Sequence, residues 1–418
     1  MRVRSLGPEA TAAHLRAPAA APDDLEGDVR AILDEVRSGG DAAVRRLTER
    51  FDPAELAAEE LAVPPAEIES SIAVLPLEVI AGLRTAMANV RAAAEAQLRE
   101  PVAVKLDAGQ ELEFHEVPVR RAAAYVPGGR APYPSTVVMC AVTARAAGVD
   151  ELAVCAPPGP EGRAHPAILA ACGLCGVTEV YRMGGAQAIA ALAYGTESVR
   201  SVDVIVGPGN RWVTEAKRQV AGTVGIDGLA GPSELAIVAT AGADAELAAL
   251  DLLAQAEHGP DTFVALISPD DGLVGDVAAS LEALARERPT VVGEVAFVVR
   301  VADARSALRL AEELAPEHLQ LVGAEAEGLA PLVRSAGAVF VGRDAGTAFG
   351  DYVAGSNHVL PTGAAARFAG ALSVATFRRR MARISLPDGA AARLAPAGAA
   401  IARAEGFPVH AESMERRA

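Results

Sequence analysis

The sequence predicts an α/β protein with two Rossmann-like domains, each built around a doubly wound parallel sheet. Two observations support this fold class. Between residues 121 and 221, and again after Gly231-Pro232-Ser233, short apolar strands alternate with helices across glycine-rich turns, a pattern typical of parallel sheets. The chain also has 418 residues, 51% of them hydrophobic, which is enough for two or three cores.

The first 120 residues contribute helices but few strands. Residues 1–27 form a loose lead-in rich in Pro and Ala. The expected elements are a helix over Val29–Phe51 interrupted at Gly39-Gly40, a long amphipathic helix over Ile80–Glu100 and a β-rich passage over Val104–Val119. Asp41 can cap the second half of the first helix. We expect this region to cover the sheet formed after residue 232, which makes that domain discontinuous.

Residues 121–221 are the most regular part of the chain. The expected strands are Arg121–Val126, Glu151–Ala156, Glu179–Met183 and Val202–Val206. The expected helices are Val138–Ala147, Pro166–Cys172, Ala186–Tyr194 and Arg211–Ala221. Glycine turns such as Pro127-Gly128-Gly129 and Gly207-Pro208-Gly209 follow the strands, so this stretch predicts one complete sheet.

The same alternation continues to residue 341. The expected strands are Leu235–Ala239, Phe263–Ser268, Val295–Val301, Leu319–Val322 and Ala338–Val341. Helices lie between them, and Asp303 can cap the helix that runs to Leu314. The last part, residues 373–418, is expected to be helical, interrupted by proline, and too short to hold a core by itself.

These patterns divide the chain into four parts. They are an N-terminal segment (1–24), a first α/β domain (25–123 plus 233–372), a second α/β domain (124–232) and a C-terminal tail (373–418). Each domain falls within the usual size range of about 50–250 residues.

Charge and composition exclude several classes of protein. The net charge of −16 repels phosphate backbones, so we expect no nucleic-acid partner. No apolar run reaches the roughly 18 residues that a membrane helix requires, and the N-terminus lacks the apolar core of a signal peptide. Four cysteines are too few for a disulfide framework, so we interpret them as small buried hydrophobes in a cytoplasmic protein.

The stretch Asp251–Pro260 contains the first candidate site. Gln255 and His258 are three residues apart at the end of a helix, so both side chains project from one side of it. An amide oxygen and an imidazole nitrogen are suitable ligands for a cation such as zinc. The alternative is a polar helix end that faces water.

Two further stretches carry acid–base groups. Glu317 and His318 stand between a helix and a strand, and we expect them at the carboxyl-terminal mouth of the sheet, where they offer two proton-transfer groups. Asp351 and His358 belong to a glycine-rich loop, in which Asp351 is a candidate oxygen ligand. The alternatives are a solvated helix end for the first pair and a turn-forming aspartate for the second.

Three more residues are candidates by position. His410 lies eight residues from the C-terminus, where side chains are usually frayed surface unless the tail docks on a neighbouring subunit. Gln187 and Asn210 stand at strand-to-helix turns, which can bring backbone N–H groups to a phosphate. The chain has no G-x-G-x-x-G motif, so glycine turns that serve packing are the alternative. The remaining histidines, at 14, 115 and 165, are interpreted as surface or packing residues.

Taken together, these stretches closely resemble the bacterial histidinol dehydrogenases over nearly the whole chain. The shared segments are ILDEVRSGGDAA, LTERFD, YVPGGRAPYPS, GGAQAIAALAYGT, VGPGN, GPSE, DLLAQAEHGPD, APEHL, GDYVAGSNHVLPT and ARAEG followed by His410. The resemblance implies an NAD-dependent, zinc-containing, four-electron oxidation of L-histidinol to L-histidine through L-histidinal, the last steps of histidine biosynthesis.

The resemblance also implies a role for each candidate residue. One zinc ion per subunit is held by Gln255, His258, Asp351 and His410, and the last comes from the other chain of a homodimer with exchanged tails. Glu317 and His318 are the catalytic pair. Substrate contacts are Ser233, Gln255, His258, Glu317, His318, Asp351, His358, Glu405 and His410. NAD contacts are Tyr125, Gln187 and Asn210. The first domain then carries the metal and catalytic residues, and the second is the NAD side.

Three other functions are weighed against this one. A related zinc and NAD dehydrogenase could oxidise another small diol, but His358 and Glu405 resemble contacts that read the imidazole and amine of histidinol. A zinc hydrolase would use Glu317 to activate metal-bound water and would turn over without NAD. A two-lobed binding protein would form no NADH.

Overall fold

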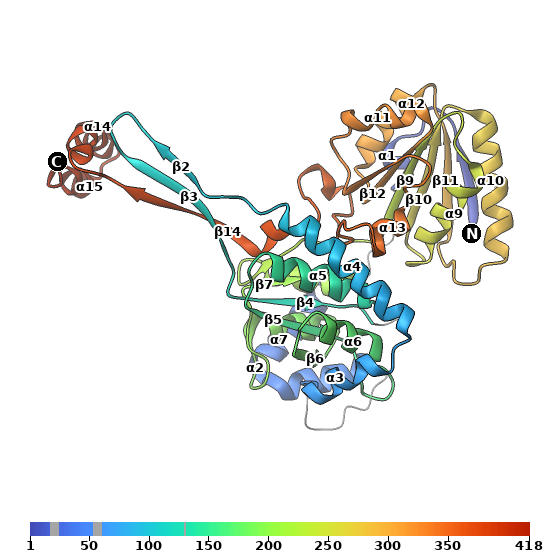
Figure 1. Cartoon of the computed structure of the whole chain (residues 1–418), viewed down its shortest axis with the longest axis horizontal. Helices are drawn as coiled ribbons and strands as arrows, with labels where there is room; N and C mark the ends of the chain where they lie inside the picture. Colours follow the sequence, from blue (N-terminus) through green and yellow to red (C-terminus); the bar gives the residue numbers. More distant parts are fainter. Residues whose placement is uncertain (17–24, 53–60, 129–130) are drawn as a thin grey trace.

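Two α/β domains and a long arm make up the chain in the computed structural model (Figure 1). The structure describes residues 1–16, 25–52, 61–128 and 131–418. Part of the predicted lead-in and Gly129 of the predicted glycine turn lie outside the described residues.

The first sheet is parallel throughout. Its strand order is β1 (Arg2–Leu6), β11 (Val295–Arg300), β10 (Phe263–Ser268), β9 (Glu234–Ala239), β12 (His318–Val322) and β13 (Ala338–Val341). The sequence analysis did not predict β1. This strand pairs with β11, so the first residues belong to the first sheet and not to a separate segment.

Helices cover both faces of this sheet. The helices are α1 (Ala12–Leu15), α9 (Ala245–Ala256), α10 (Asp271–Arg286), α11 (Ala304–Leu314), α12 (Ala324–Glu327) and α13 (Thr347–Tyr352). Alternate residues of β9 enter different cores: Ala236 packs with α11, and Leu235 packs with α9 and α10. Successive side chains of a strand point to opposite faces, so a sheet with two covered faces has apolar residues at nearly every position.

The second sheet is also parallel. Its strand order is β6 (Glu179–Arg182), β5 (Glu151–Ala156), β4 (Arg121–Tyr125), β7 (Val204–Val206) and β8 (Gly225–Ile226). One core contains α3 (Pro65–Ala73), α4 (Leu77–Glu95), α5 (Pro134–Ala146) and α6 (Pro166–Leu174). The other contains α2 (Leu25–Phe51), α7 (Gly185–Tyr194) and α8 (Arg211–Val220).

Both sheets wind outward from a central strand in the same way. From β9 the chain adds β10 and β11 on one side and then β12 and β13 on the other. From β4 it adds β5 and β6 on one side and then β7 and β8 on the other. The winding therefore reverses at β9/β12 in the first sheet and at β4/β7 in the second, the positions where such folds form ligand crevices.

The predicted assignment of residues 25–123 to the first domain is wrong for the helices in this segment. Val36 of α2 is buried in the same core as Ile189 of α7, and Val90 of α4 is buried in the same core as Val138 of α5. These helices therefore cover the second sheet. An amphipathic pattern identifies the buried face of a helix, but it does not identify the sheet that this face packs against.

The predicted interruption of the first helix is confirmed, with a different role for its aspartate. Gly40 leaves the helical conformation inside α2, at φ 54° and ψ −142°. The Asp41 carboxylate accepts hydrogen bonds from the Thr196 hydroxyl and the Ser198 N–H. Asp41 thus joins α2 to the loop that follows α7, whereas the sequence predicted a helix cap.

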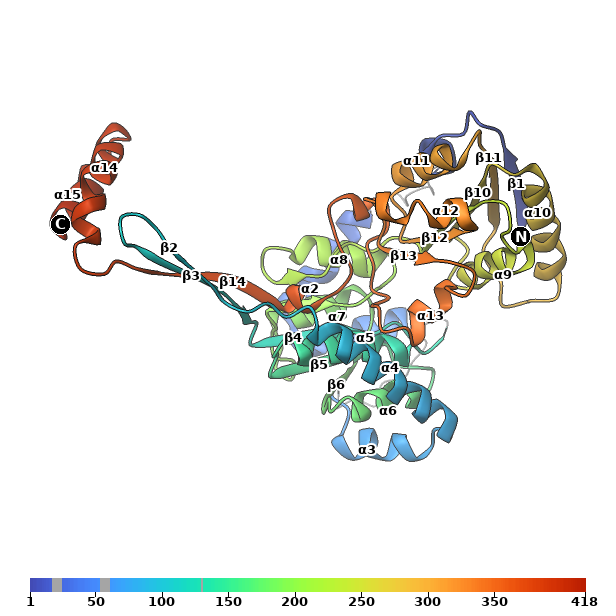
Figure 2. The ribbon, with the colours of Figure 1, turned by 45° about the horizontal axis from the view of Figure 1, so that its top comes forward.

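A narrow antiparallel arm leaves the second domain (Figures 1 and 2). It consists of β2 (Val102–Lys105), β3 (Glu111–Pro118) and β14 (Arg378–Ser385), and its far end carries α14 (Ala390–Ala404) and α15 (Pro408–Glu415). The prediction of a wholly helical tail is wrong at β14. Nearly all of β14 is exposed, so its sequence has no alternation of buried and exposed residues to reveal a strand.

Within the described residues, no single helix is both long and apolar enough for a membrane crossing. The bent pair α3–α4 passes that test by length and composition only.

Candidate active site

The candidate catalytic residues lie at the amino edge of the first sheet. Glu317 directly precedes β12, His318 is the first residue of β12, and Ser233 directly precedes the neighbouring strand β9. The predicted position at a carboxyl-terminal mouth is therefore wrong. A loop that leads from a helix into a strand reaches the amino end of that strand, as the connection from α11 to β12 does.

Glu317 is a buried carboxyl group held by two donors. The Ser233 hydroxyl donates to Oε2 at 2.6 Å, and the Glu234 N–H donates to the same oxygen at 2.8 Å. Burial raises the pKa of Glu317 to about 7 because the charged form loses its water, although His318 and the two donors oppose this rise. A carboxyl group that titrates near neutrality is well suited to exchanging protons with a substrate or a water molecule.

His318 is held in one orientation by the main chain. Its Nδ1 lies 3.0 Å from the carbonyl oxygen of Glu234. Because a carbonyl only accepts, Nδ1 carries the hydrogen, and Nε2 of the neutral ring has a free lone pair. Nε2 lies 3.5 Å from Oδ1 of Asp351. Burial alone would lower the pKa of His318, but the hydrogen bond to Asp351 and the charges of Glu317 and Asp351 raise it to about 9.

The predicted metal ligands Gln255, His258 and Asp351 lie near this pair. Gln255 is in the last turn of α9 and Asp351 is in α13, but α9 ends at Ala256, so the expectation that His258 also projects from the helix is wrong, and His258 lies in the turn after it. The Gln255 amide nitrogen donates to the Ser233 hydroxyl at 2.7 Å, while its oxygen Oε1 is buried without a hydrogen-bond partner. Burial alone would raise the pKa of Asp351, but its hydrogen bond to His318 lowers it, so Asp351 is a carboxylate. A buried acceptor without a donor is unfavourable, and a cation would remove that cost.

One chain supplies only part of the predicted metal shell. Among the residues that the structure describes, no group of three or more His, Cys, Asp and Glu side chains is placed to hold a metal ion. His410 is exposed on α15, and Glu405 is exposed just after α14, both at the far end of the arm (Figures 1 and 2). The structure of a single chain therefore does not bring these two residues to the other predicted site residues.

His358 lies between the two domains. Its Nδ1 is 2.8 Å from the main-chain oxygen of Asp351, and its Nε2 is 3.0 Å from the hydroxyl of Thr136 in α5. The carbonyl fixes the hydrogen on Nδ1, so Nε2 accepts from the threonine hydroxyl. Burial lowers the pKa of His358, which keeps the ring neutral. The candidate site of the first domain is thereby tied to the second domain.

The predicted NAD contacts lie at the carboxyl edge of the second sheet. Tyr125 ends β4, Gln187 is in the first turn of α7, and Asn210 caps α8 by accepting from two backbone N–H groups at 3.0 and 3.2 Å. The Tyr125 hydroxyl accepts from the Gly185 N–H at 3.2 Å, and the Gln187 side-chain nitrogen is buried without a partner. Two helix starts therefore converge beside β4, as an anionic cofactor requires.

A buried ion pair holds one of these turns. Gly207 adopts φ 106°, and a Cβ atom there would lie 2.1 Å from the Tyr125 carbonyl oxygen, so only glycine fits. Lys217 donates to the Gly207 carbonyl and to Asp227, both at 2.6 Å, and Asp227 accepts from the Gly207 N–H at 2.7 Å. The sequence analysis missed Lys217 and Asp227, because nothing local indicates that they meet.

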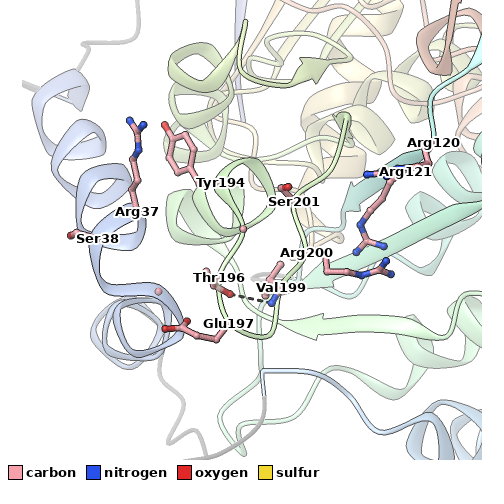
Figure 3. A pocket seen from close by; sticks show the side chains of 12 residues that line it. Arg37, Ser38, Arg120, Arg121, Tyr194, Thr196, Glu197, Val199, Arg200 and Ser201 are labelled. Carbon is pink, nitrogen blue, oxygen red and sulfur yellow. Dashed lines mark hydrogen bonds between the residues drawn. The ribbon is translucent and has the colours of Figure 1, made fainter.

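A separate depression of about 670 Å³ lies at the amino edge of the second sheet (Figure 3). None of the predicted site residues lines it. The guanidinium of Arg121 binds Glu179 at 2.8 Å, and that of Arg200 binds Glu151 at 2.6 Å. Both guanidiniums are paired with carboxylates of the protein, so we interpret the cluster as structural.

Two residues next to the catalytic pair were also missed. Glu234 contacts Glu317 and His318, and Arg16 forms an ion pair with Glu234. The sequence did contain a signal for Glu234, because this residue directly follows the predicted substrate contact Ser233 and is the first residue of β9. Arg16 carries no local signal, because it lies 218 residues from its partner.

Comparisons with known proteins identify the chain's relatives. A family model described as histidinol dehydrogenase matches residues 15–418. A histidinol dehydrogenase from Synechococcus sp. is 44% identical over 398 residues, which cover 94% of this chain and 92% of the relative. One from Cereibacter sphaeroides is 45% identical over 402 residues, with the same two shares. The crystal structure of histidinol dehydrogenase from Elizabethkingia anophelis matches with a TM-score of 0.93 and 30% identity, covering 100% of this chain and 98% of that chain.

Proposed function

The chain belongs to the histidinol dehydrogenase family, and we propose that it works with zinc and NAD where the amino edge of the first sheet meets the second domain. As a member of that family it is an oxidoreductase that converts histidinol to histidine in histidine biosynthesis. The observation that carries the proposal is the buried Glu317–His318 pair beside the unpartnered oxygen of Gln255.

Gln255, His258 and Asp351 of one chain, together with His410 of a second copy, would hold the zinc ion. The set combines nitrogen and oxygen donors, which zinc accepts. The buried Oε1 of Gln255 supports the assignment because it has no hydrogen-bond donor in the protein. When bound, zinc would supply a site for nitrogen atoms of the substrate and so orient its alcohol carbon. A cation at Asp351 also compensates the charge that helps to keep His318 protonated.

His318 is proposed as the base of the alcohol step. Its Nδ1 is engaged by the Glu234 carbonyl, so Nε2 is the atom that accepts a proton. With NAD bound, the hydroxyl proton of the substrate would pass to Nε2 as its carbon gives up a hydride to the cofactor, which converts the alcohol to the aldehyde. Bound NAD would supply the hydride acceptor, and the protein supplies the base and the orientation.

Glu317 is proposed as the base that hydrates the aldehyde. A water molecule would add to the aldehyde carbon as one of its protons passes to the Glu317 carboxylate. His318 would return the proton it took in the alcohol step from Nε2 to the carbonyl oxygen, which completes the hydrate and leaves His318 neutral. His318, neutral again, would then take a hydroxyl proton of the hydrate as its carbon gives up a second hydride to another NAD, so that the carboxylic acid is formed. The pKa of about 7 leaves a substantial fraction of Glu317 ionised at neutral pH.

The remaining contacts are assigned by position. His358 and Ser233 lie at the site and would contact the substrate, and Glu405 would reach it from the tail of a second copy. Tyr125, Gln187 and Asn210 would contact NAD, and the free amide nitrogen of Gln187 supports this because it needs an acceptor. Cytoplasmic localisation stays a prediction.

A homodimer with exchanged tails would complete the site. The arm and the helices it carries expose several large apolar side chains, including Val102 at 58%, Ile384 at 67% and Val409 at 72% exposure. Such surfaces usually mark a protein interface. Mixing inactive Gln255→Ala and His410→Asn chains tests the exchange. Half of the dimers formed at random are mixed and hold one intact site of two, so activity returns to about a quarter of the wild-type level.

The proposed reaction is tested by its stoichiometry. We expect two NADH per histidinol consumed, and one NADH would overturn the assignment of both oxidations to this site. If mixed Gln255→Ala and His410→Asn chains recover no activity although mixed dimers form, tail exchange is excluded.

A further inference from the structure

We propose that Arg16 and Glu234 are positioning residues that hold Glu317 and His318 in place for aldehyde oxidation. This inference rests on the roles proposed for Glu317 and His318. It adds two charged residues that come from distant parts of the chain, the residue that directly follows α1 and the first position of β9.

The Glu234 carboxylate is a buried junction of three segments. Its side chain is only 5% exposed, and both of its oxygens bind the Arg16 guanidinium, with Oε2 2.8 Å from Nη2. Oε1 also accepts from the Gly363 N–H at 3.1 Å, and Oε2 accepts from the Glu317 N–H at 3.3 Å. The side chain of Glu234 thus contacts the backbone of the catalytic glutamate directly.

The main chain of Glu234 contacts the functional atoms of the same pair. Its N–H donates to Oε2 of Glu317 at 2.8 Å, and its carbonyl oxygen lies 3.0 Å from Nδ1 of His318. These two contacts orient the carboxylate and set the tautomer of the imidazole. A displacement of Glu234 would therefore move the proposed water-activating group and change which ring nitrogen of His318 is free.

Arg16 holds the backbone just before the catalytic pair. Its Nη2 donates to the Leu314 carbonyl at 2.6 Å, and its guanidinium lies 5.8 Å from the Phe263 ring centroid. Leu314 ends α11, and the next residue, Ala315, adopts a left-handed conformation with φ 44°, which is unfavourable for a residue with a side chain. Arg16 thus binds the backbone before this strained turn, at the Leu314 carbonyl, and Glu234 binds the backbone after it, at the Glu317 N–H.

Charge explains why the pair occurs together. The carboxylates of Glu234 and Glu317 each accept a hydrogen bond from the backbone N–H of the other residue at the starts of β9 and β12, and the Arg16 guanidinium is the ion-pair partner of the buried Glu234 carboxylate. Removal of one member of a buried ion pair leaves the other uncompensated, so the neighbouring groups shift. A misplacement of about 1 Å at a reacting group can lower a rate by 10²-fold.

The experiment compares the two half-reactions in Glu234→Gln, Arg16→Gln and Arg16→Lys proteins, each assayed with histidinol and with histidinal as substrate. We expect Glu234→Gln to lower kcat for histidinal oxidation roughly 10- to 100-fold and to lower the histidinol step less. KM for both substrates and the zinc content should stay within about twofold of wild type, since Gln255, His258 and Asp351 remain. Arg16→Lys should recover part of what Arg16→Gln loses, because it restores the charge.

The matched control is Arg2→Gln, which removes the exposed Arg2–Glu294 ion pair of the same sheet and should change neither step. Equal losses in both steps that follow the loss of folded protein, or no difference between Arg16→Lys and Arg16→Gln, would overturn the inference. If Glu234→Gln does not fold, the two Arg16 variants decide the question. A wild-type protein that forms no NADH from histidinol would instead refute the proposed function.

Discussion

The two sheets wind in the same order, yet they present opposite edges to the proposed reaction. In the first sheet, Ser233 and Glu317 stand at the starts of β9 and β12. In the second, Tyr125 ends β4, and Asn210 follows the end of β7. Each sheet uses the strand pair at which its winding reverses, but one uses the amino ends and the other the carboxyl ends.

The difference shows which chemical groups each edge of a parallel sheet can offer to a ligand. A carboxyl edge leads into helix starts, whose free N–H groups bind an anionic cofactor. An amino edge receives the ends of helices, so it offers side chains fixed by strand backbone, as Glu234 fixes Glu317 and His318. Acid–base and metal chemistry therefore suits the amino edge, and nucleotide binding suits the carboxyl edge.

The two edges meet through the segment that follows α13. His358 contacts Thr136 at 3.0 Å, and the Asn357 amide donates to the Met139 carbonyl at 3.1 Å. Both partners belong to α5, the helix that follows β4. The proposed site can therefore be perturbed separately at each edge and at this junction.

Loss of the metal should have the largest effect. Gln255→Ala and His410→Asn should each lose zinc and lower turnover roughly 10³-fold or more, because the substrate is no longer oriented. Metal analysis and NADH assays measure this, and NAD binding should persist because it uses the other edge. Full activity in metal-stripped His410→Asn protein would contradict the shared site.

Glu317→Gln should separate the two oxidation steps. We expect histidinal oxidation to fall roughly 10²- to 10⁴-fold, while histidinol oxidation falls less. The pKa of Glu317 is about 7 and its ionised form is the base, so wild-type histidinal oxidation should rise with pH through about 7. The variant should lack this rise in its pH profile, and equal loss in both steps would remove the assigned role.

Gln187→Ala should weaken only the binding of NAD at the carboxyl edge of the second sheet. Losing one hydrogen bond to the cofactor should raise KM for NAD about tenfold at nearly constant kcat. Zinc content should not change. Gln219→Ala is the control, since Gln219 bonds Glu215 and the Glu26 carbonyl on α8 and α2. An unchanged KM for NAD in Gln187→Ala would place the cofactor elsewhere.

Thr136→Val should have the smallest effect on the kinetics, because it changes only the contact between α5 and His358. The substitution keeps the shape of the side chain and removes its hydrogen bond to His358, worth about 1 kcal/mol, so KM for histidinol should rise about fivefold. Steady-state kinetics measure the change. Thr85→Val, on the exposed face of α4, is the control. A loss of NAD binding instead would mean that Thr136 serves the cofactor.

Local patterns in the sequence determined the elements and several of their ends. Asp303 accepts from the Ser306 N–H at the start of α11, and Asn210 caps α8, as their residue types and positions favour. The strand–turn–helix alternation identified the strands of both parallel sheets apart from β1 and the short β8. Such features depend on residues a few positions apart, so a sequence can reveal them without knowledge of the fold.

Only the tertiary structure decided which edge carries the acid–base pair, which sheet α2 and α4 cover, and how Arg16 reaches Glu234. These outcomes depend on contacts between segments far apart in the sequence, such as Glu317 with Glu234 over 83 residues and Arg16 with Glu234 over 218, for which charge and hydrophobicity allow many partners. An exposed strand such as β14 is equally undetermined, because its pairing with β3 comes from backbone hydrogen bonds that any sequence can form. Residue type and short-range spacing identified the residues that can take part in the site, and long-range packing determined which of them are in contact.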